Sequence, residues 1–199
     1  MMTGVCRVLG VVAVGLLLTA CASDQGNRFY TLQPLAEQQP ASATASIGVA
    51  PVKVPGWMDR SNLVWGDGGF RLHQKAMDRW AEPLEDALTR ITSQNLSRLF
   101  SNEQVVTGPW LKSESPDLEV RVEILGLADT GSLLELDARW EIVANSRTHS
   151  GEKLRKARSE KFIRPLPANA GSEQFVEGFS QLMVKLAEDI RVDIKQLGQ

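Results

Sequence analysis

Histidine and cysteine are scarce in this 199-residue chain, which has two of each. So few of these residues leave little material for a metal site, or for a nucleophile paired with a base. Charge of one sign is not in excess either: 22 basic residues stand against 24 acidic ones, so nothing in the balance points to nucleic acid. These shortages argue against a metalloenzyme and against a nucleic-acid partner, and they favour a protein that is not an enzyme.

The apolar run at the start of the chain is too short to span a membrane. Residues 8–18 form eleven uncharged residues, whereas a membrane-spanning helix needs about 20. The run follows the positive charge of Arg7 and precedes small residues, which is the pattern of a secretory signal peptide. We therefore expect residues 1–20 to be cleaved from the exported chain.

The residues at the predicted cut resemble a lipobox, the motif of bacterial lipoproteins. They are LTAC at positions 18–21, directly behind the apolar run. Cys21 has no partner in the mature chain because Cys6 leaves with the signal, and acylation accounts for an unpaired cysteine in an exported protein. We expect a diacylglycerol and an N-acyl chain on Cys21, and no cofactor. The alternative is a plain secretory signal that is cut at Ala20 or Ala22.

Two or three acyl chains hold a protein stably at a bilayer. By resemblance to enterobacterial sorting, an aspartate directly after the cysteine retains a lipoprotein in the inner membrane. Ala22 and Ser23 occupy these positions here, so we expect the periplasmic face of the outer membrane of a Gram-negative bacterium. The lipidated N-terminus and short tether, residues 21–28, span at most about 25 Å, which holds the domain close to its membrane.

Residues 29–199 are expected to form a single domain that begins with strands. Apolar and polar residues alternate strictly in residues 117–124 and 134–142, on either side of a turn signal at 129–132. This alternation predicts an antiparallel hairpin with one face on the core. Less regular patterns predict further strands at 29–32, 47–52 and 152–163, and a hairpin at 62–65 and 70–73. The first of these strands is expected to pair across the loop of residues 33–46.

Two amphipathic helices complete the expected fold. Apolar residues at helical spacing predict one helix of roughly 18 residues from Pro83 to Phe100. A second apolar stripe predicts a long C-terminal helix over residues 175–197. The order of strands, helix, strands and helix indicates an α+β fold, in which an antiparallel sheet carries two amphipathic helices packed on one face.

Chemistry-bearing motifs are few. His73 and His149 lie far apart and have no ligand-type neighbours, and neither a phosphate-binding loop nor a nucleophile elbow is present. The turn at residues 54–58 carries Trp57 and Met58, which either pack onto the core or form an exposed patch that binds a partner. Six basic residues within residues 153–164 form either a charged edge strand or a contact with anionic lipid or an acidic partner.

A set of short motifs makes the chain similar to a known family. The motifs are FYTL at 29–32, IGV at 47–49, VKVPGWMDR at 52–60, LV at 63–64, WAEPL at 80–84 and NLSRL at 95–99. Their order and spacing resemble the ABC-type transport auxiliary lipoprotein family (PqiC-like), and the order of predicted elements extends the resemblance to the C-terminus. One departure is the Trp57–Met58 pair, where the family commonly has an aromatic residue followed by leucine.

The resemblance implies a non-enzymatic periplasmic component of lipid trafficking. Its partners would be a PqiB-like protein with MCE domains, which builds a conduit between the membranes, the associated inner-membrane components, and outer-membrane lipid. The lipoprotein would dock the periplasmic end of this conduit at the outer membrane, or help to hand lipid across. Its candidate partner contacts are Trp57, Met58 and Trp80. Trp80 is more simply read as packing on the sheet before the first helix. Self-association stays open, as do two other functions: a structural adapter of another envelope assembly, such as a secretion channel, and a periplasmic hydrolase.

Overall fold

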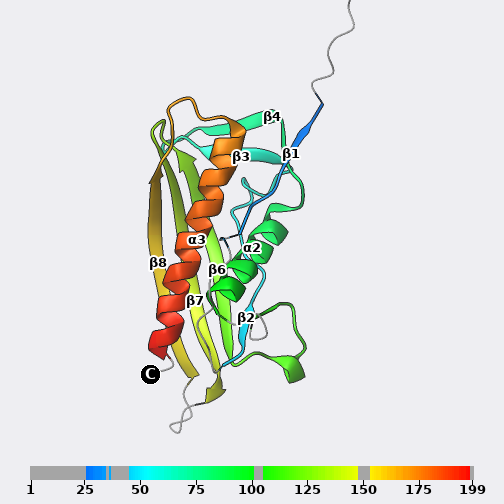
Figure 1. Cartoon of the computed structure of the whole chain (residues 1–199), viewed down its shortest axis with the longest axis vertical. Helices are drawn as coiled ribbons and strands as arrows, with labels where there is room; N and C mark the ends of the chain where they lie inside the picture. Colours follow the sequence, from blue (N-terminus) through cyan, green and yellow to red (C-terminus); the bar gives the residue numbers. More distant parts are fainter. Residues whose placement is uncertain (1–25, 35, 37–44, 101–104, 148–152, 198–199) are drawn as a thin grey trace, which may run out of the picture.

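A computed structural model describes residues 26–34, 36, 45–100, 105–147 and 153–197. Cys21 and His149 lie outside the described residues. The fold is α+β, with one curled sheet and two α-helices (Figure 1). In chain order the elements are β1 (Arg28–Tyr30), β2 (Ile47–Val49), β3 (Asn62–Gly66), β4 (Leu72–Trp80), α2 (Leu84–Leu99), β5 (Val105–Thr107), the short 3₁₀ helix η2 (Lys112–Glu114), β6 (Leu118–Asp129), β7 (Leu133–Arg147), β8 (Lys153–Pro165) and α3 (Ser172–Leu197).

Of the three long strands, β6 and β7 confirm the strict alternation, and β8 confirms the less regular strand predicted at 152–163. β6 and β8 each pair antiparallel with β7, with Val122 opposite Trp140 and Trp140 opposite Arg158. The apolar residues of β7 at alternate positions are all buried and face the core. The charged residues between them lie on the other face of the sheet, as strict alternation requires.

The expectation of an antiparallel sheet is wrong in part, because the sheet is mixed. β2 pairs parallel with both β5 and β6, β3 pairs parallel with the end of β6, and β1 pairs parallel with β4. β1 is a strand as predicted, and it pairs across the 33–46 loop as expected; its partner there is β4, and the two strands run parallel. Alternation reports which side chains share a face and carries no information on the direction of the neighbouring strand.

β2 continues along β6 beyond its own three residues. The Ala50 N–H donates to the Val120 carbonyl (2.9 Å), and the Lys53 N–H donates to the Val122 carbonyl (3.1 Å). The Ile124 N–H donates back to the Lys53 carbonyl (2.9 Å). The predicted strand at 47–52 is therefore present as an irregular pairing along the same edge, and it delivers the chain into the turn at 55–58.

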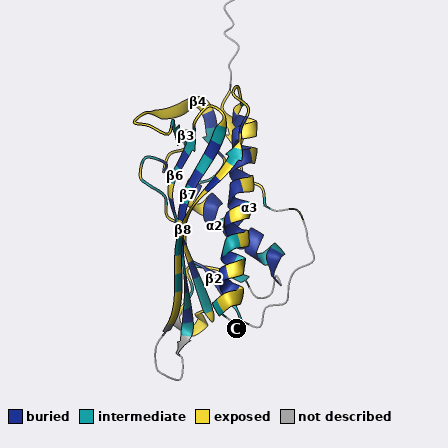
Figure 2. Ribbon diagram, turned by 90° about the vertical axis from the view of Figure 1, so that its left-hand side faces the viewer, coloured by how far each residue is buried: buried dark blue, intermediate teal, exposed yellow. Residues whose placement is uncertain are grey.

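Both helices confirm the predicted periodicity, and both cover the same side of the sheet (Figure 2). Pro83 stands just before α2, where a residue without an N–H is tolerated. The buried stripes of the two helices face the sheet, and the helices also contact each other. In the core the rings of Trp80 and Phe179 lie 6.2 Å apart. Burial of these apolar faces, at about 25 cal/mol per Å² removed from water, is the main stabilising contribution.

The β3–β4 hairpin is longer than predicted because β4 contains an irregularity. The register moves from Asn62 opposite Arg79 to Val64 opposite Gln74. The Asn62 side-chain amide donates to the carbonyls of Lys75 (2.8 Å) and Ala76 (3.1 Å), which satisfies backbone groups that the bulge leaves unpaired. The hairpin and the start of β1 lie at one end of the molecule, and the end of α3 lies at the other (Figure 1).

Candidate functional site

The first strand ties the predicted anchor segment to the domain. The described chain begins at Gly26, five positions after Cys21. β1 pairs with β4, and the Ala81 N–H donates to the Tyr30 carbonyl (2.8 Å), so the chain is fixed from its first strand onward. We call β1 and the β3–β4 hairpin together the anchor-proximal end.

A buried carboxylate lies behind β1. Asp78 on β4 is 1% exposed, and its carboxylate accepts a hydrogen bond from the Arg28 guanidinium (2.6 Å) and another from the Ser172 hydroxyl. Burial raises the pKa of Asp78, but the Ser172 and Arg28 hydrogen bonds outweigh it, so the pKa of this carboxyl lies below its usual range. Asp78 thus joins β1, β4 and the first residue of α3 through one ionised group.

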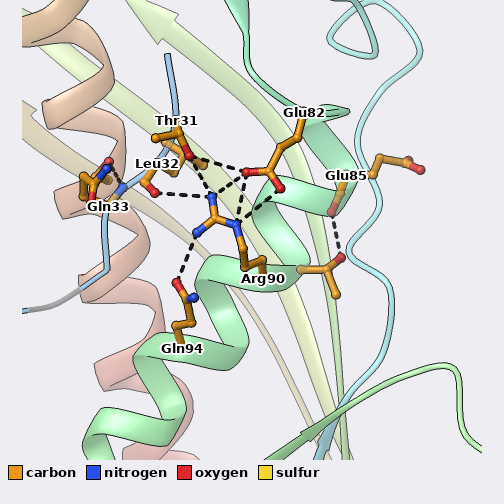
Figure 3. A network of polar contacts seen from close by, with 9 residues as sticks. Thr31, Leu32, Gln33, Glu82, Glu85, Arg90 and Gln94 are labelled. Carbon is orange, nitrogen blue, oxygen red and sulfur yellow. Dashed lines mark hydrogen bonds and ion pairs between the residues drawn. The ribbon is translucent and has the colours of Figure 1, made fainter. Parts of the chain in front are cut away.

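A second polar network holds the chain just after β1 (Figure 3). The Arg90 guanidinium on α2 forms an ion pair with Glu82 (2.5 Å), and it donates to the Thr31 hydroxyl (2.9 Å) and the Leu32 carbonyl (3.4 Å). It also donates to the Gln94 side chain (3.1 Å). Because one planar guanidinium reaches all four groups, the segment after β1 and the start of α2 keep a fixed relation.

The apolar side chains of the turn of residues 55–58 pack onto the core. The Met58 N–H donates to the Pro55 carbonyl (2.8 Å), and Met58 is 1% exposed. Trp80 is 5% exposed. Only Trp57 of the three candidate contacts is half-buried and reaches the surface. The expected contact of Met58 and Trp80 with a partner therefore needs correction: both side chains belong to the core.

The basic run on β8 is mostly neutralised within the domain. β8 pairs only with β7 among the described strands, so it is an edge strand. Its cations face acids on both sides of the sheet, which favours the charged-edge reading over a free basic surface. The ion pairs join Arg155 to Glu141, Lys156 to Asp193, Arg158 to Glu160, Asp189 and Asp193, and Lys161 to Glu135 and Asp137.

The outer face of the sheet holds an open hollow of about 700 Å³. Most of the charges that line it pair with one another: Arg139 with Glu123, and both Arg121 and Arg155 with Glu141. Such paired groups form a solvated ladder and do not converge on a reactive position. Among the described residues, no cluster of three or more potential metal ligands occurs. His73 stacks against Trp65, with their rings 5.9 Å apart.

Sequence patterns gave only a weak signal for the buried acids. Asp193 occupies a position of the apolar stripe of α3, seven residues after Leu186, so its place in the stripe was visible in the sequence. No sequence pattern indicated that Asp78 is buried. The bulge in β4 interrupts the alternation that would have placed Asp78 on the same face as Trp80.

The comparison with protein families decides the identity. Residues 30–191 match the family described as the ABC-type transport auxiliary lipoprotein component. The chain belongs to the ABC-type transport auxiliary lipoprotein family. No curated protein matches the chain.

Solved structures with the family's fold are distant in sequence. One, described as an uncharacterized protein, is 15% identical with a TM-score of 0.63, and the match covers 85% of this chain and 99% of the other. A Xanthomonas campestris protein of family DUF330 is 12% identical with a TM-score of 0.65, and the match covers 86% of this chain and 97% of the other. These likenesses show the fold.

Family membership identifies the chain as an auxiliary, transport-associated lipoprotein component of the cell envelope. In the described part of the chain, neither helix has the apolar length that a bilayer crossing needs. An auxiliary component of this family has a supporting role beside a transporter, and this role is not itself catalysis.

Proposed function

We propose that the chain is an outer-membrane lipoprotein, acylated at Cys21, that serves an MCE-type, ABC-linked system for lipid transport between the membranes. It docks the conduit of that system at the periplasmic face of the outer membrane. The observation that carries the proposal is the family match over residues 30–191, which begins nine positions after the lipobox cysteine.

The anchor-proximal end supports this role. Arg28, seven positions after Cys21, is ion-paired with Asp78, and β1 is paired with β4 from its first residue. A tether of this length extends at most about 25 Å. The bilayer and the domain consequently stay close together, as a component that brings a conduit to a membrane requires.

We propose that the system's MCE-domain protein contacts the turn at residues 55–58 through Trp57. Met58 of the same turn is buried and acts as support, and Trp80 is buried in the core. Further support comes from α2, where the Thr89 hydroxyl accepts the Val52 N–H (2.9 Å) and donates to the Glu85 carbonyl (2.7 Å). A half-buried tryptophan on a well-supported turn is a typical anchor residue of protein interfaces.

The anchor is tested with the Cys21→Ser variant of the full chain. The intact mass of the wild-type mature protein should show the acyl chains, and sucrose-gradient fractionation should place it with the outer membrane. Cys21→Ser should give a folded protein that has left the membrane fraction, as circular dichroism and the same fractionation will show. A variant that still sediments with outer membranes would mean that contacts other than the acyl chains hold the chain there.

The partner is tested by mild crosslinking of the full-length lipoprotein, followed by purification in detergent and mass spectrometry. Recovery of an MCE-domain protein supports the transport function. Recovery of a secretion channel or another envelope assembly, without an MCE-domain protein, would support the adapter function instead. The masses of the crosslinked species also report the number of copies of this chain.

A photocrosslinking residue at Trp57 tests the contact itself. The matched control carries the same residue at Ile163, an exposed position of β8. We expect crosslinks to the MCE-domain protein from position 57 and not from position 163. Equal crosslinking from both positions would show that Trp57 is not a specific contact, although the two proteins would still be partners.

A further inference from the structure

The anchor-proximal end exposes large apolar side chains that the fold leaves uncovered. Phe70, in the turn of the β3–β4 hairpin, is fully exposed, and Leu72 beside it is half exposed. Phe29 on β1 and Met77 on β4 are exposed as well. The hairpin turn and the first two thirds of β4 are exposed, and they project from the rest of the molecule (Figure 2).

The turn that carries Phe70 has a defined structure. The Asp67 carboxylate accepts hydrogen bonds from the N–H of Gly69 (2.8 Å) and of Arg71 (3.3 Å), and it pairs with the Arg71 guanidinium (3.1 Å). Gly68 has a φ of +80°, which favours glycine, and a side chain there would approach Thr130 on the neighbouring turn. Phe70 is therefore presented at a fixed place and not on an unstructured loop.

Positive charge accompanies the apolar residues. Both acids of this region already have cations: Asp67 is paired with Arg71, and Asp78 with Arg28. Lys75 and Arg79 form no ion pair with a described acid; Lys75 lies over the Trp65 ring (5.9 Å), and Arg79 donates to the Asn27 side chain (3.0 Å). An exposed surface that combines aromatic and basic side chains matches the interface of an anionic membrane.

The position of the anchor indicates which occupant covers this surface. Gly26 and Arg28 line the same hollow, of about 420 Å³, as Lys75 and Met77. From Gly26 back to Cys21 the chain extends at most about 18 Å. The start of β1 and the hairpin also lie at the same end of the molecule (Figure 1). A bilayer that holds the acyl chains of Cys21 is thus the nearest large partner available to the hairpin.

We propose that the β3–β4 hairpin is a second membrane contact, which rests on the proposed acylation at Cys21. Phe70 and Leu72 enter the interfacial region of the bilayer that holds the anchor, while Lys75 and Arg79 face anionic phospholipid headgroups. Two contacts, the acyl chains and the hairpin, fix the orientation of the domain on the membrane, which a single point of attachment does not do. The opposite end, with β5 and the end of α3, then points into the periplasm.

The test uses single fluorescent probes on the lipidated full-length protein. Because the acylated Cys21 is the only cysteine of the predicted mature chain, a Phe70→Cys variant offers one reactive thiol for an environment-sensitive dye. Leu111→Cys, an exposed apolar position between β5 and η2, is the matched control. Both proteins are reconstituted into vesicles of phosphatidylethanolamine and phosphatidylglycerol that contain a nitroxide-labelled lipid.

We expect a blue-shifted emission of the probe at position 70, with quenching by the nitroxide lipid at least threefold stronger than at position 111. Replacing Lys75 and Arg79 with glutamate, or omitting phosphatidylglycerol, should weaken the quenching at position 70. Equal quenching at the two positions would overturn the proposal. A blue shift without lipid quenching would also overturn it, because the surface would then be covered by protein, either a partner or a second copy of the chain.

Failure of the anchor is distinguished by the intact mass of the purified protein. If the mass shows no acyl chains, the anchor proposal fails. The probes are then measured on the unlipidated chain with Cys21→Ser added, so that position 70 or 111 again carries the single reactive thiol, in the presence of an excess of the same vesicles. Quenching at position 70 there still supports the hairpin as a membrane contact, and its absence overturns it. Phe70 makes little contribution to the core because it is fully exposed, so its replacement should leave the thermal unfolding unchanged.

Discussion

The indole N–H of Trp140 donates a 2.9 Å hydrogen bond to the carboxylate of Asp193 in the layer between β7 and α3. Asp193 is 1% exposed, and Lys156 (2.8 Å) and Arg158 (3.4 Å) of the edge strand reach the same carboxylate. The Arg158 guanidinium also lies 5.0 Å from the Trp140 ring. The ionised Asp193 therefore links β7, the edge strand β8 and the C-terminal helix α3.

Replacing Asp193 with asparagine should lower the free energy of unfolding by about 1–3 kcal/mol, because hydrogen bonds to a buried charge are lost. Urea titration followed by tryptophan fluorescence measures the change. Asp189→Asn is the control on the same helix: burial raises the pKa of Asp189 in spite of Arg158, so neutralising it should leave stability unchanged or raise it. Equal losses from the two variants would contradict the role given to Asp193.

Acid should weaken the fold through four carboxyl groups whose pKa values lie below the usual range. One is Asp67, whose pKa is lowered mainly by the hydrogen bond from the Gly69 N–H. Burial raises the pKa of Asp78 and of Asp193, but hydrogen bonds outweigh it: those from Ser172 and Arg28 for Asp78, and those from Lys156 and Trp140 for Asp193. Hydrogen bonds from the Ser46 backbone and hydroxyl lower the pKa of Asp117.

A carboxyl group whose pKa is lower in the folded state than in the unfolded chain stabilises the fold when it is ionised. This stabilisation is fully present above the pKa of the unfolded chain, about 3.9, and it is lost as the pH falls through the pKa of the folded state. The free energy of unfolding should consequently hold steady from pH 7 to about 5 and decline below about 4. Denaturant titrations at several pH values test this. Asp193→Asn should show a shallower decline, and an identical slope would exclude Asp193 from the pH dependence.

Gly48→Ala should destabilise the end of the sheet near β5. A Cβ there would lie 2.3 Å from Pro116 and 2.8 Å from the Trp110 ring, so these residues have to move, which costs about 1–3 kcal/mol. Gly126→Ala on β6 is the control, because nothing lies within 4 Å of its Cβ. Thermal unfolding of both variants gives the comparison. A Gly48→Ala protein as stable as the wild type would mean that the Trp110 ring moves aside freely.

Arg90→Ala should loosen the chain just after β1 without unfolding the domain. The Gln33 N–H donates to the Ser180 hydroxyl (3.1 Å), and the Leu32 carbonyl beside it loses its guanidinium donor in the variant. Hydrogen exchange of the Gln33 amide should accelerate about tenfold, which corresponds to about 1.4 kcal/mol. Arg121→Ala, on the outer face of β6, should leave this amide unchanged. If the exchange rate of this amide is unchanged in Arg90→Ala, the hydrogen bond from Gln33 to the Ser180 hydroxyl is sufficient to hold the segment, and Arg90 is not needed for it.

The sequence predicted those elements whose pattern is local. Strict alternation located β6 and β7, and helical spacing located α2 and α3 to within about three residues. The parallel pairings of β1, β2 and β3 were not predictable, because they join segments that are far apart in the chain. β5 was missed because three residues are too few to display a period.

The candidate site was predictable to a smaller extent. The hairpin was expected at residues 62–65 and 70–73, but its extension to Trp80 depends on the bulge that Asn62 stabilises. A bulge shifts the alternation of inward-facing and outward-facing residues. The sequence pattern therefore did not show that Asp78 faces the core. Trp57, Met58 and Trp80 were singled out together, and only three-dimensional packing separates the half-buried Trp57 from the other two.

The parallel pairing of β1 with β4 also determines how the domain bears mechanical load. In a chain held by acyl groups at Cys21, tension from a bound partner enters the fold at Arg28 and runs along β1. The hydrogen bonds to β4 then share the force in shear, whereas strands pulled apart from one end break their bonds in succession. Asp78 passes part of that force to α3 through Ser172. If Cys21 is acylated as proposed, β1 is thus the joint through which force passes between the membrane and the domain.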